Sequence, residues 1–283
     1  MRLTRQTTLE KATTAIFLAM NADAKVELCR VRDDARAISA VANTITISFA
    51  NDPLIEWLRP RAPAWSIDQP DTFKWQYRRI QRTMVQGIAL QSAPALQKDQ
   101  DHNGFRGSGL SDVSTPLLRA AIAQDTKPLE DAGAAVLLFP PPGRHRWTLR
   151  RLLLRLKLWC LDIFDPISEE GANTQRLETM MATHEKTIAR VKTEYNAQDA
   201  WYLEVVAVHP SLQGRGLGKR AMRSVLDFVQ DEPVILECTR ESNVGFYRSL
   251  GFEVVEEVEL VDGGDTVKLW LMLRQTPKTE DAS

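Results

Sequence analysis

The stretch Trp201–Val229 constrains the fold more than any other part of the chain. It begins with an apolar, β-branched run, Tyr202–Val208, which is typical of a strand buried on both faces of a sheet. Pro210 ends this run, because proline lacks the N–H that a central strand needs. A glycine-rich loop follows, and apolar residues then recur at helical spacing within Lys219–Val229. The sequence therefore predicts a strand, a glycine loop and a helix in direct succession.

The glycine loop, Gln213–Gly218, is suited to bind a phosphate or pyrophosphate. Glycines allow successive backbone N–H groups to point into one concavity at a helix N-terminus, where the helix dipole is positive. Arg215, Lys219 and Arg220 add positive charge nearby. The alternative is an ordinary glycine turn between a strand and a helix. The spacing fits neither the GxGxxG loop of Rossmann folds nor the GxxxxGK[ST] loop of P-loop proteins.

Two spaced motifs make the chain resemble the GNAT superfamily of acyl-CoA-dependent N-acetyltransferases. The first motif is the acyl-CoA loop Q/R-x-x-G-x-G/A, to which Gln213, Gly216 and Gly218 correspond. The second is Asn243–Phe252, which is similar to a family element that carries an asparagine, a tyrosine and a final Gly-Phe. A second short strand, Val234–Thr239, separates the two motifs in the order that the family has.

This resemblance implies a mixed α/β GNAT fold, with a mostly antiparallel, twisted central sheet that is splayed in the middle and flanked by helices. The strand 134–139, cut off by prolines and a glycine at 140–143, resembles in particular a group of small fungal and bacterial GNAT enzymes related to puromycin N-acetyltransferase. We expect residues 1–283 to form a single GNAT domain with its CoA-binding core at about 201–252. The polar, glycine-rich segment 92–131 is predicted to be an insertion, either mobile or acting as a lid.

Apolar periodicity predicts the elements around this core. Helices are predicted at 8–20, 35–43, 115–124 and 175–195, and another helix begins at 71 and runs toward or into a strand that ends at about 90. Strands are predicted at 25–32 and in a hairpin formed by 253–260 and 266–273. Residues 144–160 are predicted to form a surface helix whose basic residues make up its solvated face. The alternative is a basic amphipathic helix that binds anionic lipid or RNA.

Net charge, cysteine usage and the N-terminal segment indicate which partners and which cellular compartment to expect. The net charge of −1 gives no general attraction to nucleic acid or membrane. Cys29, Cys160 and Cys238 are widely spaced and lack metal-site spacing, which indicates a reducing compartment and no metal. The N-terminal 24 residues are not typical of a secretory signal, although a mitochondrial presequence is an alternative. We expect a cytoplasmic monomer or homodimer with no nucleic-acid or membrane partner.

The resemblance also implies that acetyl-CoA is the cosubstrate and names the residues that contact it. Free backbone N–H groups near the end of the central strand are expected to meet the thioester and the pantetheine arm. The residues implied to bind CoA are Ala207, Val208, His209, Gln213, Gly214, Arg215, Gly216, Leu217, Gly218, Lys219, Asn243 and Tyr247.

Acetyl transfer to an amine needs a base for the amine and an acid for the departing thiolate. Tyr247 matches the family's tyrosine beside the CoA sulfur, and the alternative is an aromatic that packs the helix on the sheet. Glu204 is the one acidic side chain in its strand, and we predict that it is the base. Strict alternation would place Tyr202, Glu204 and Val206 on one face. The alternative for Glu204 is a structural ion pair with an arginine.

The resemblance implies transfer of an acetyl group to a primary amine, which we expect to belong to a small molecule, by direct attack in a ternary complex. Ser211 has no His/Asp constellation to activate it, so a covalent acyl-enzyme is not supported. Four tryptophans lie in the segments that, by the resemblance, build the acceptor side in this family, which suggests an apolar or aromatic amine: Trp57, Trp65, Trp75 and Trp147. The alternative is that they are core residues. The alternatives are acetylation of a protein lysine or N-terminus, and a non-catalytic acyl-CoA-binding module.

Overall fold

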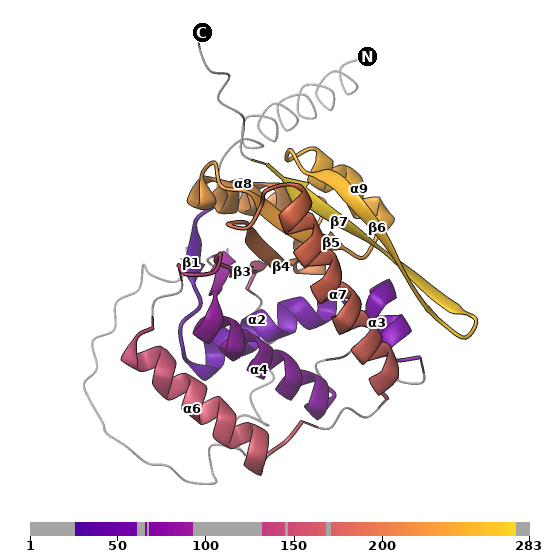
Figure 1. The fold of residues 1–283 in the computed structure, drawn as a ribbon. Coiled ribbons are helices and arrows are strands. Elements are labelled where there is room, and N and C mark those ends of the chain that lie inside the picture. Colours follow the sequence, from indigo (N-terminus) through magenta and orange to yellow (C-terminus); the bar gives the residue numbers. More distant parts are fainter. Residues whose placement is uncertain are drawn as a thin grey trace, which may run out of the picture.

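The computed structural model describes residues 26–60, 66, 68–92, 132–144, 147–167 and 171–275 (Figure 1). The strands are β1 (Leu28–Arg30), β2 (Ile88–Ser92), β3 (Ala134–Phe139), β4 (Trp201–Val208), β5 (Val234–Cys238), β6 (Glu253–Asp262) and β7 (Asp265–Arg274). The helices are α2 (Ala35–Ser48), α3 (Pro53–Leu58), α4 (Pro70–Gln86), α6 (Leu149–Phe164), α7 (Thr174–Glu194), α8 (Leu217–Val229) and α9 (Glu241–Arg248). The predicted helices at 8–20 and 115–124, and the insertion from 93 to 131, lie outside the described residues.

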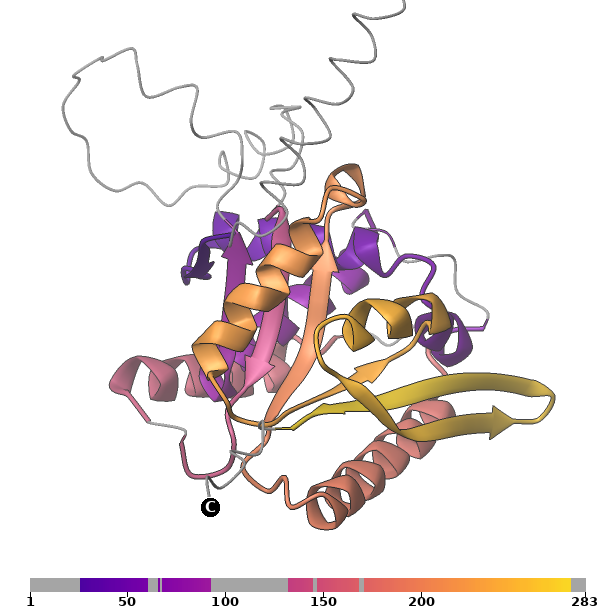
Figure 2. The same cartoon turned by 90° about the horizontal axis from the view of Figure 1, so that it is seen from above.

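The strands form one seven-stranded sheet in the order β1-β2-β3-β4-β5-β7-β6. Every neighbouring pair is antiparallel except β4 and β5, which run parallel. The parallel pair brings the end of β4 and the end of β5 to the same edge of the sheet. Figure 2 shows the long hairpin of β6 and β7 extending from one side of this twisted sheet. The predicted mixed α/β architecture with a mostly antiparallel central sheet is confirmed.

Helices cover both faces of the sheet. On one face α8 packs through Met222 and Val225, and α9 through Val244, on an apolar cluster that includes residues of β4 and β5. On the other face α2 and α4 pack on β3 and β4, and α7 packs beside them on β5 and β7 (Figures 1 and 2). The apolar stripes read from the sequence therefore face the sheet, as amphipathic helices in a layered domain must.

Aspartate side chains cap the N-termini of two helices on the predicted acceptor side, α2 and α3. Asp34 caps α2 by accepting a hydrogen bond from the backbone N–H of Ala37 at 2.8 Å. Asp52 caps α3 in the same way, and Pro53 occupies the first helical position, where its missing N–H costs nothing. A tight turn after Phe49 separates the two helices, so the start of α3 lies close to the end of α2.

Strand β4 carries the irregularity on which the site depends. Leu137 pairs with Val205 whereas Leu138 pairs with Leu203, so Glu204 is an extra residue in a β-bulge. On its other side β4 pairs with β5 only at three positions, from Trp201 to Leu203. Beyond the bulge the two strands diverge, and a gap opens between their ends.

The bulge corrects one prediction. Leu203 and Val206 pack in the cluster under α8, whereas Val205 packs in the cluster under α2 and α4. Because the extra residue shifts the alternation by one, Val206 does not share a face with Tyr202 and Glu204 as strict alternation predicted. Tyr202 packs on the α7 side, and Glu204 bonds to a side chain of α4.

Helix α6 overlaps the helix predicted at 144–160 but begins at Leu149 and ends at Phe164, and it differs from the prediction in its solvent face. Leu154 and Leu158 are buried against α4, whereas Leu152 and Leu156 are each 55% exposed. Apolar side chains, not basic ones, therefore dominate the outer surface of α6. Among the described residues, the apolar character and length of the helices fall short of what a bilayer crossing requires.

Candidate active site

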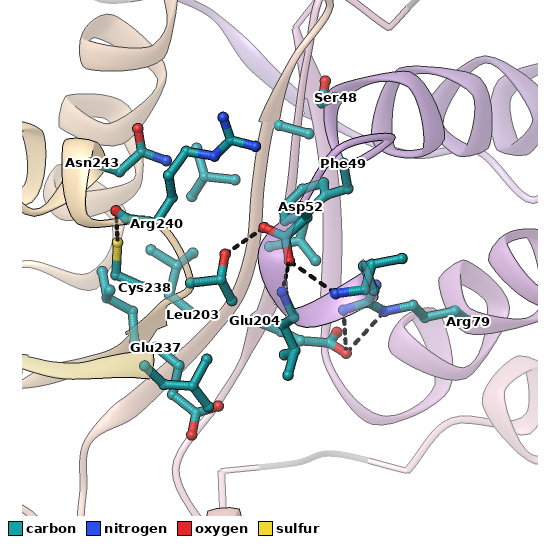
Figure 3. Close-up of a pocket in the computed structure, with 18 of the residues that line it drawn as sticks. Ser48, Phe49, Asp52, Arg79, Leu203, Glu204, Glu237, Cys238, Arg240 and Asn243 are labelled. Carbon is teal, nitrogen blue, oxygen red and sulfur yellow. Dashed lines mark hydrogen bonds and ion pairs between the residues drawn. The ribbon is translucent and has the colours of Figure 1, made fainter. Parts of the chain in front are cut away.

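The gap between β4 and β5 opens into a cavity of about 1240 Å³. Its walls come from the ends of β4 and β5, the glycine loop with the start of α8, and α9 on one side. The opposite side is built by α3, α4 and α7. Figure 3 shows side chains from both halves pointing into the space between the diverging strands. The cavity therefore connects the predicted CoA loop with the predicted acceptor side.

The glycine loop has the geometry that a phosphate cradle requires. Gly214 and Gly216 have φ angles of +72° and +74°, and a Cβ on either would meet no atom within 4 Å. Gly216 is the N-cap of α8, so the loop presents backbone N–H groups at a helix N-terminus. Gln213 holds the loop to β4 by donating from Nε2 to the carbonyl oxygen of Val208 at 2.9 Å.

The backbone N–H groups of β4 do not all face the cavity. The N–H of His209 donates to the carbonyl of Gly133 at 2.9 Å, which corrects the expectation that it is free for CoA. Because N–H directions alternate along a strand, Ala207 faces β3 like His209, whereas Val206 and Val208 face the gap. The strand thus offers amides at Val206 and Val208, and the first of these was not predicted.

Most of the predicted CoA-binding residues line the cavity, and two do not. The cavity wall includes Ala207, Val208, Gln213, Gly214, Gly216, Leu217, Gly218, Lys219, Asn243 and Tyr247. His209 and Arg215 are not part of it. His209 bonds through Nδ1 to the hydroxyl of Ser211 at 2.7 Å, a contact that the sequence analysis did not foresee. Ser211 is also absent from the cavity wall, so this pair is placed to shape the turn after β4.

Tyr247 lies on α9 with its ring between Phe246 and Phe252, at centroid distances of 5.1 and 5.9 Å. Burial raises the pKa of the Tyr247 phenol above its usual value, and the nearby Cys238 adds to the shift. The hydroxyl therefore stays protonated at neutral pH, which is the state that a proton donor needs. The ring contacts of Tyr247 with Phe246 and Phe252 also agree with the alternative that Tyr247 only packs α9 on the sheet.

Glu204 forms the ion pair that the sequence left open as an alternative. Arg79 of α4 donates a hydrogen bond from Nε to Glu204 Oε1 at 3.0 Å, and its Nη2 lies 2.9 Å from the same oxygen in an ion pair (Figure 3). The second oxygen, Oε2, is buried and has no hydrogen-bond partner among the described residues. The Arg79 guanidinium also lies over the Trp75 ring, 5.2 Å from its centroid. In the predicted base, Oε1 is thus bound to Arg79, whereas Oε2 has no hydrogen bond to any described residue.

Asp52 is a second carboxyl group in the cavity, and sequence reasoning missed its role. Its Oδ1 accepts from the amides of Leu54 and Ile55, and Oδ2 accepts from Thr239 at the end of β5 (Figure 3). Burial raises the pKa of Asp52, although these hydrogen bonds and the charge of Arg240 oppose the shift. The pair Asp52-Pro53 is typical of the start of a helix, so a capping role could be read from the sequence. The contact of Asp52 with Thr239 at the end of β5 could not, because the two residues are far apart in sequence.

Three further polar side chains meet on the α7 side of the cavity. Glu237 Oε2 lies 2.9 Å from His184 Nδ1 and accepts from the Tyr202 hydroxyl at 3.1 Å. The hydrogen bond to Glu237 raises the pKa of His184, while burial opposes it. Burial raises the pKa of Tyr202 well above its usual value. No sequence signal could have found this cluster, because its members lie on three separate elements.

The tryptophans correct the prediction about the acceptor side. Trp75 lines the cavity, but Trp57 is buried against the β6–β7 hairpin, and its indole donates to Asp265 at 3.4 Å. Trp147 is exposed beside α6, and Trp65 lies outside the described residues. The part of the chain that the structure describes contains no group of three His, Cys, Asp or Glu side chains placed to hold a metal ion.

Comparison with known proteins matches one segment of the chain to a family. Residues 177–252 match the model of the acetyltransferase (GNAT) family. A curated relative, the N-alpha-acetyltransferase RimI of Mycobacterium tuberculosis, is 38% identical over 55 residues, which is 19% of this chain. The match spans about a third of that relative's length, 35%.

Two solved structures share the fold across most of the chain. One is from Corynebacterium glutamicum, described as histone acetyltransferase HPA2 and related acetyltransferase, with a TM-score of 0.50 and 13% identity over 89% of this chain and 97% of that one. The other is arylalkylamine N-acetyltransferase 2 from Aedes aegypti, with a TM-score of 0.50 and 12% identity over 89% of this chain and 99% of that one. At these identities the likeness concerns the fold. The relation to puromycin N-acetyltransferase stays a prediction.

Proposed function

Because residues 177–252 match the GNAT acetyltransferase family and the chain has the GNAT fold, we propose that the protein is an acetyl-CoA-dependent N-acetyltransferase for a primary amine of a small molecule. The observation that carries the proposal is the cavity between the diverging ends of β4 and β5, with the glycine loop on one side and carboxyl groups on the other. This arrangement suits two substrates that must meet within one site.

The residues present fit acetyl-CoA. The open space beside Gly214 and Gly216 leaves room for a pyrophosphate at the N-terminus of α8, and Lys219 lines the same wall. The amides of Val206 and Val208, which face the gap, are placed to hold polar groups of the pantetheine arm and thioester. When bound, acetyl-CoA would supply the acetyl thioester that the amine attacks.

The acceptor amine must lose a proton before it attacks. We propose that Glu204 receives this proton, directly or through water, because its Oε2 atom has no hydrogen-bond partner among the described residues. Arg79 holds the carboxylate in place through Oε1. Asp52 is the second candidate, since its raised pKa brings it closer to the range in which a carboxylate serves as a base.

Tyr247 is the proposed proton donor to the departing thiolate. Its phenol lines the cavity beside the end of β5, and burial keeps it protonated. Ser211 and its partner His209 are absent from the cavity wall, which supports direct transfer without an acyl-enzyme. Both proposed proton transfers, from the amine to Glu204 and from Tyr247 to the thiolate, then take place within one cavity.

The acceptor side favours a cation with an organic body. The carboxyl groups of Asp52, Glu204 and Glu237 lie on this wall together with Trp75 and Met180. The similar Aedes aegypti protein is named for arylalkylamines, and the relative from Mycobacterium tuberculosis is named an N-alpha-acetyltransferase. Acetylation of a protein N-terminus or lysine is therefore the second candidate function.

The test is release of free thiol from acetyl-CoA with a panel of arylalkylamines, polyamines and peptides with free N-termini. Calorimetry of CoA binding runs beside it. We expect CoA to bind and at least one small amine to stimulate thiol release. Preference for peptides would support the second candidate. Binding of CoA without transfer to any acceptor would support the acyl-CoA-binding module instead.

A further inference from the structure

Helix α6 presents an apolar face to solvent. Leu149 and Phe164, at its two ends, are 73% and 82% exposed, and Trp159 is 59% exposed. At 100° per residue, the exposed apolar side chains form one continuous arc of about 140°. Within this arc lie Leu149, Leu152, Leu153, Leu156, Trp159, Ile163 and Phe164. A soluble monomer rarely exposes so continuous an apolar surface without a partner.

The face of α6 that touches the domain is more polar than its outer face. Leu154 and Leu158 pack on Val85, and this is a small apolar cluster. The rest of the attachment uses charge: Arg78 and Arg82 of α4 bond to Asp162 of α6. Apart from Leu154 and Leu158, the large apolar side chains of α6 therefore face outward, unlike those of a usual surface helix.

Basic side chains border the outer apolar arc on both sides. Arg150 and Lys157 lie on one flank and Arg155 on the other, while the acidic Asp162 faces α4. Arg155 lies over the ring of the exposed Trp147, 5.2 Å from its centroid. Arg150 contacts Asp33 at 3.7 Å but stays 70% exposed. The solvent side of α6 thus combines an apolar centre, tryptophan and positive flanks.

We propose that α6 docks on the surface of an anionic phospholipid bilayer, with its axis parallel to the membrane plane. The apolar arc would enter the boundary between headgroups and acyl chains, the basic flanks would meet anionic headgroups, and Trp159 would lie at the interface. A second copy of this chain fits less well, because packing α6 on α6 would bring the same basic flanks together. The proposal departs from the prediction that the protein has no membrane partner, and the experiment below decides between the two.

Vesicle co-sedimentation of the full chain tests the proposal. Two vesicle types are compared: neutral vesicles of pure phosphatidylcholine, and anionic vesicles that also contain about 30 mol % phosphatidylserine. On the anionic vesicles each basic residue near the surface adds to binding. We expect binding to the anionic vesicles that weakens with salt, and little binding to the neutral ones. Leu156→Glu should weaken binding at least about tenfold, because a charge enters the apolar arc. Val261→Glu, at an exposed apolar side chain of β6, should bind like the parent.

A second pair of variants separates the charges from the apolar arc. Lys157→Glu should reduce binding to anionic vesicles several-fold, whereas Lys186→Glu on the exposed side of α7 should have little effect. Thermal unfolding of each variant checks that the fold is kept. Absence of binding, equal binding to both vesicles, or a dimer in light scattering that Leu156→Glu dissociates would each overturn the proposal.

Discussion

Arg79 donates one hydrogen bond from Nε to Glu204 Oε1 at 3.0 Å, and its Nη2 forms an ion pair with the same oxygen at 2.9 Å. The other oxygen, Oε2, has no hydrogen-bond partner among the described residues. The contact joins α4 to the bulge of β4, so the carboxylate is positioned by a helix that lies 125 residues away in sequence. A fixed carboxylate with one unengaged oxygen can act as a base, and it can also be a purely structural ion pair. The two roles differ in their pH dependence.

Replacing Glu204 with Gln keeps the shape of the side chain and removes the base. We expect kcat/KM to fall by roughly 10²- to 10⁴-fold, the usual range for general base catalysis, and the acidic limb of the pH–rate profile to flatten. The measurement is the pH–rate profile with one accepted amine. Asp52→Asn serves as the comparison, because asparagine still caps α3. If Asp52→Asn flattens the limb and Glu204→Gln does not, the base is Asp52, and its raised pKa should place that limb above the ordinary range of Asp.

Tyr247→Phe removes one hydroxyl and keeps the ring between Phe246 and Phe252. Turnover should fall by roughly 10²- to 10⁴-fold while CoA affinity changes little, because only the proton donor is lost. Steady-state kinetics and calorimetry provide the two readouts. Tyr195→Phe, at the end of α7, is the control and should behave like the parent. Full activity of Tyr247→Phe would assign Tyr247 to packing alone.

Gly216→Val places a Cβ at φ +74° and into the open space of the glycine loop. We expect CoA affinity measured by calorimetry to fall below detection, because the backbone must leave its cradle conformation. Gly263→Val is the matched control: it has φ +62° and equally open surroundings, but it lies in the β6–β7 turn. Equal CoA binding by Gly216→Val and the parent would refute phosphate binding by this loop.

The contact between His184 and Glu237 should make stability depend on pH. The pKa of His184 is raised in the folded protein, so the contact stabilises the fold fully below the unfolded pKa of about 6.5 and is lost as pH rises through the folded pKa. His184→Gln should therefore lower Tm more at about pH 6 than at about pH 8.5. Thermal unfolding across this range measures the difference. In a Glu237→Gln background the same substitution should show little pH dependence, and a persistent one would point to another partner.

The sequence by itself predicted the elements whose signals are local. The strand Tyr202–Val208, the loop Gln213–Gly218 and the helix after it are encoded by neighbouring residues, because alternation, glycine and helical spacing act over a few positions. The order of the two motifs then predicted the GNAT fold. The helix from 71 that runs into a strand by 90 and the hairpin 253–273 were predicted in the same way.

Only the tertiary structure determined which side chains meet in the cavity. Asp52, Arg79 and His184 approach β4 and β5 from three helices, and no local pattern encodes such long-range contacts. The bulge at Glu204 moved Val206 to the opposite face, because one extra residue reverses a period of two. The amphipathic pattern of α6 was visible in the sequence, but which of its faces would be covered was not. In the structure the covered face carries Asp162, bonded to Arg78 and Arg82 of α4, together with Leu154 and Leu158, and the other large apolar side chains stay exposed. A local pattern cannot encode this choice, because it rests on long-range contacts with α4.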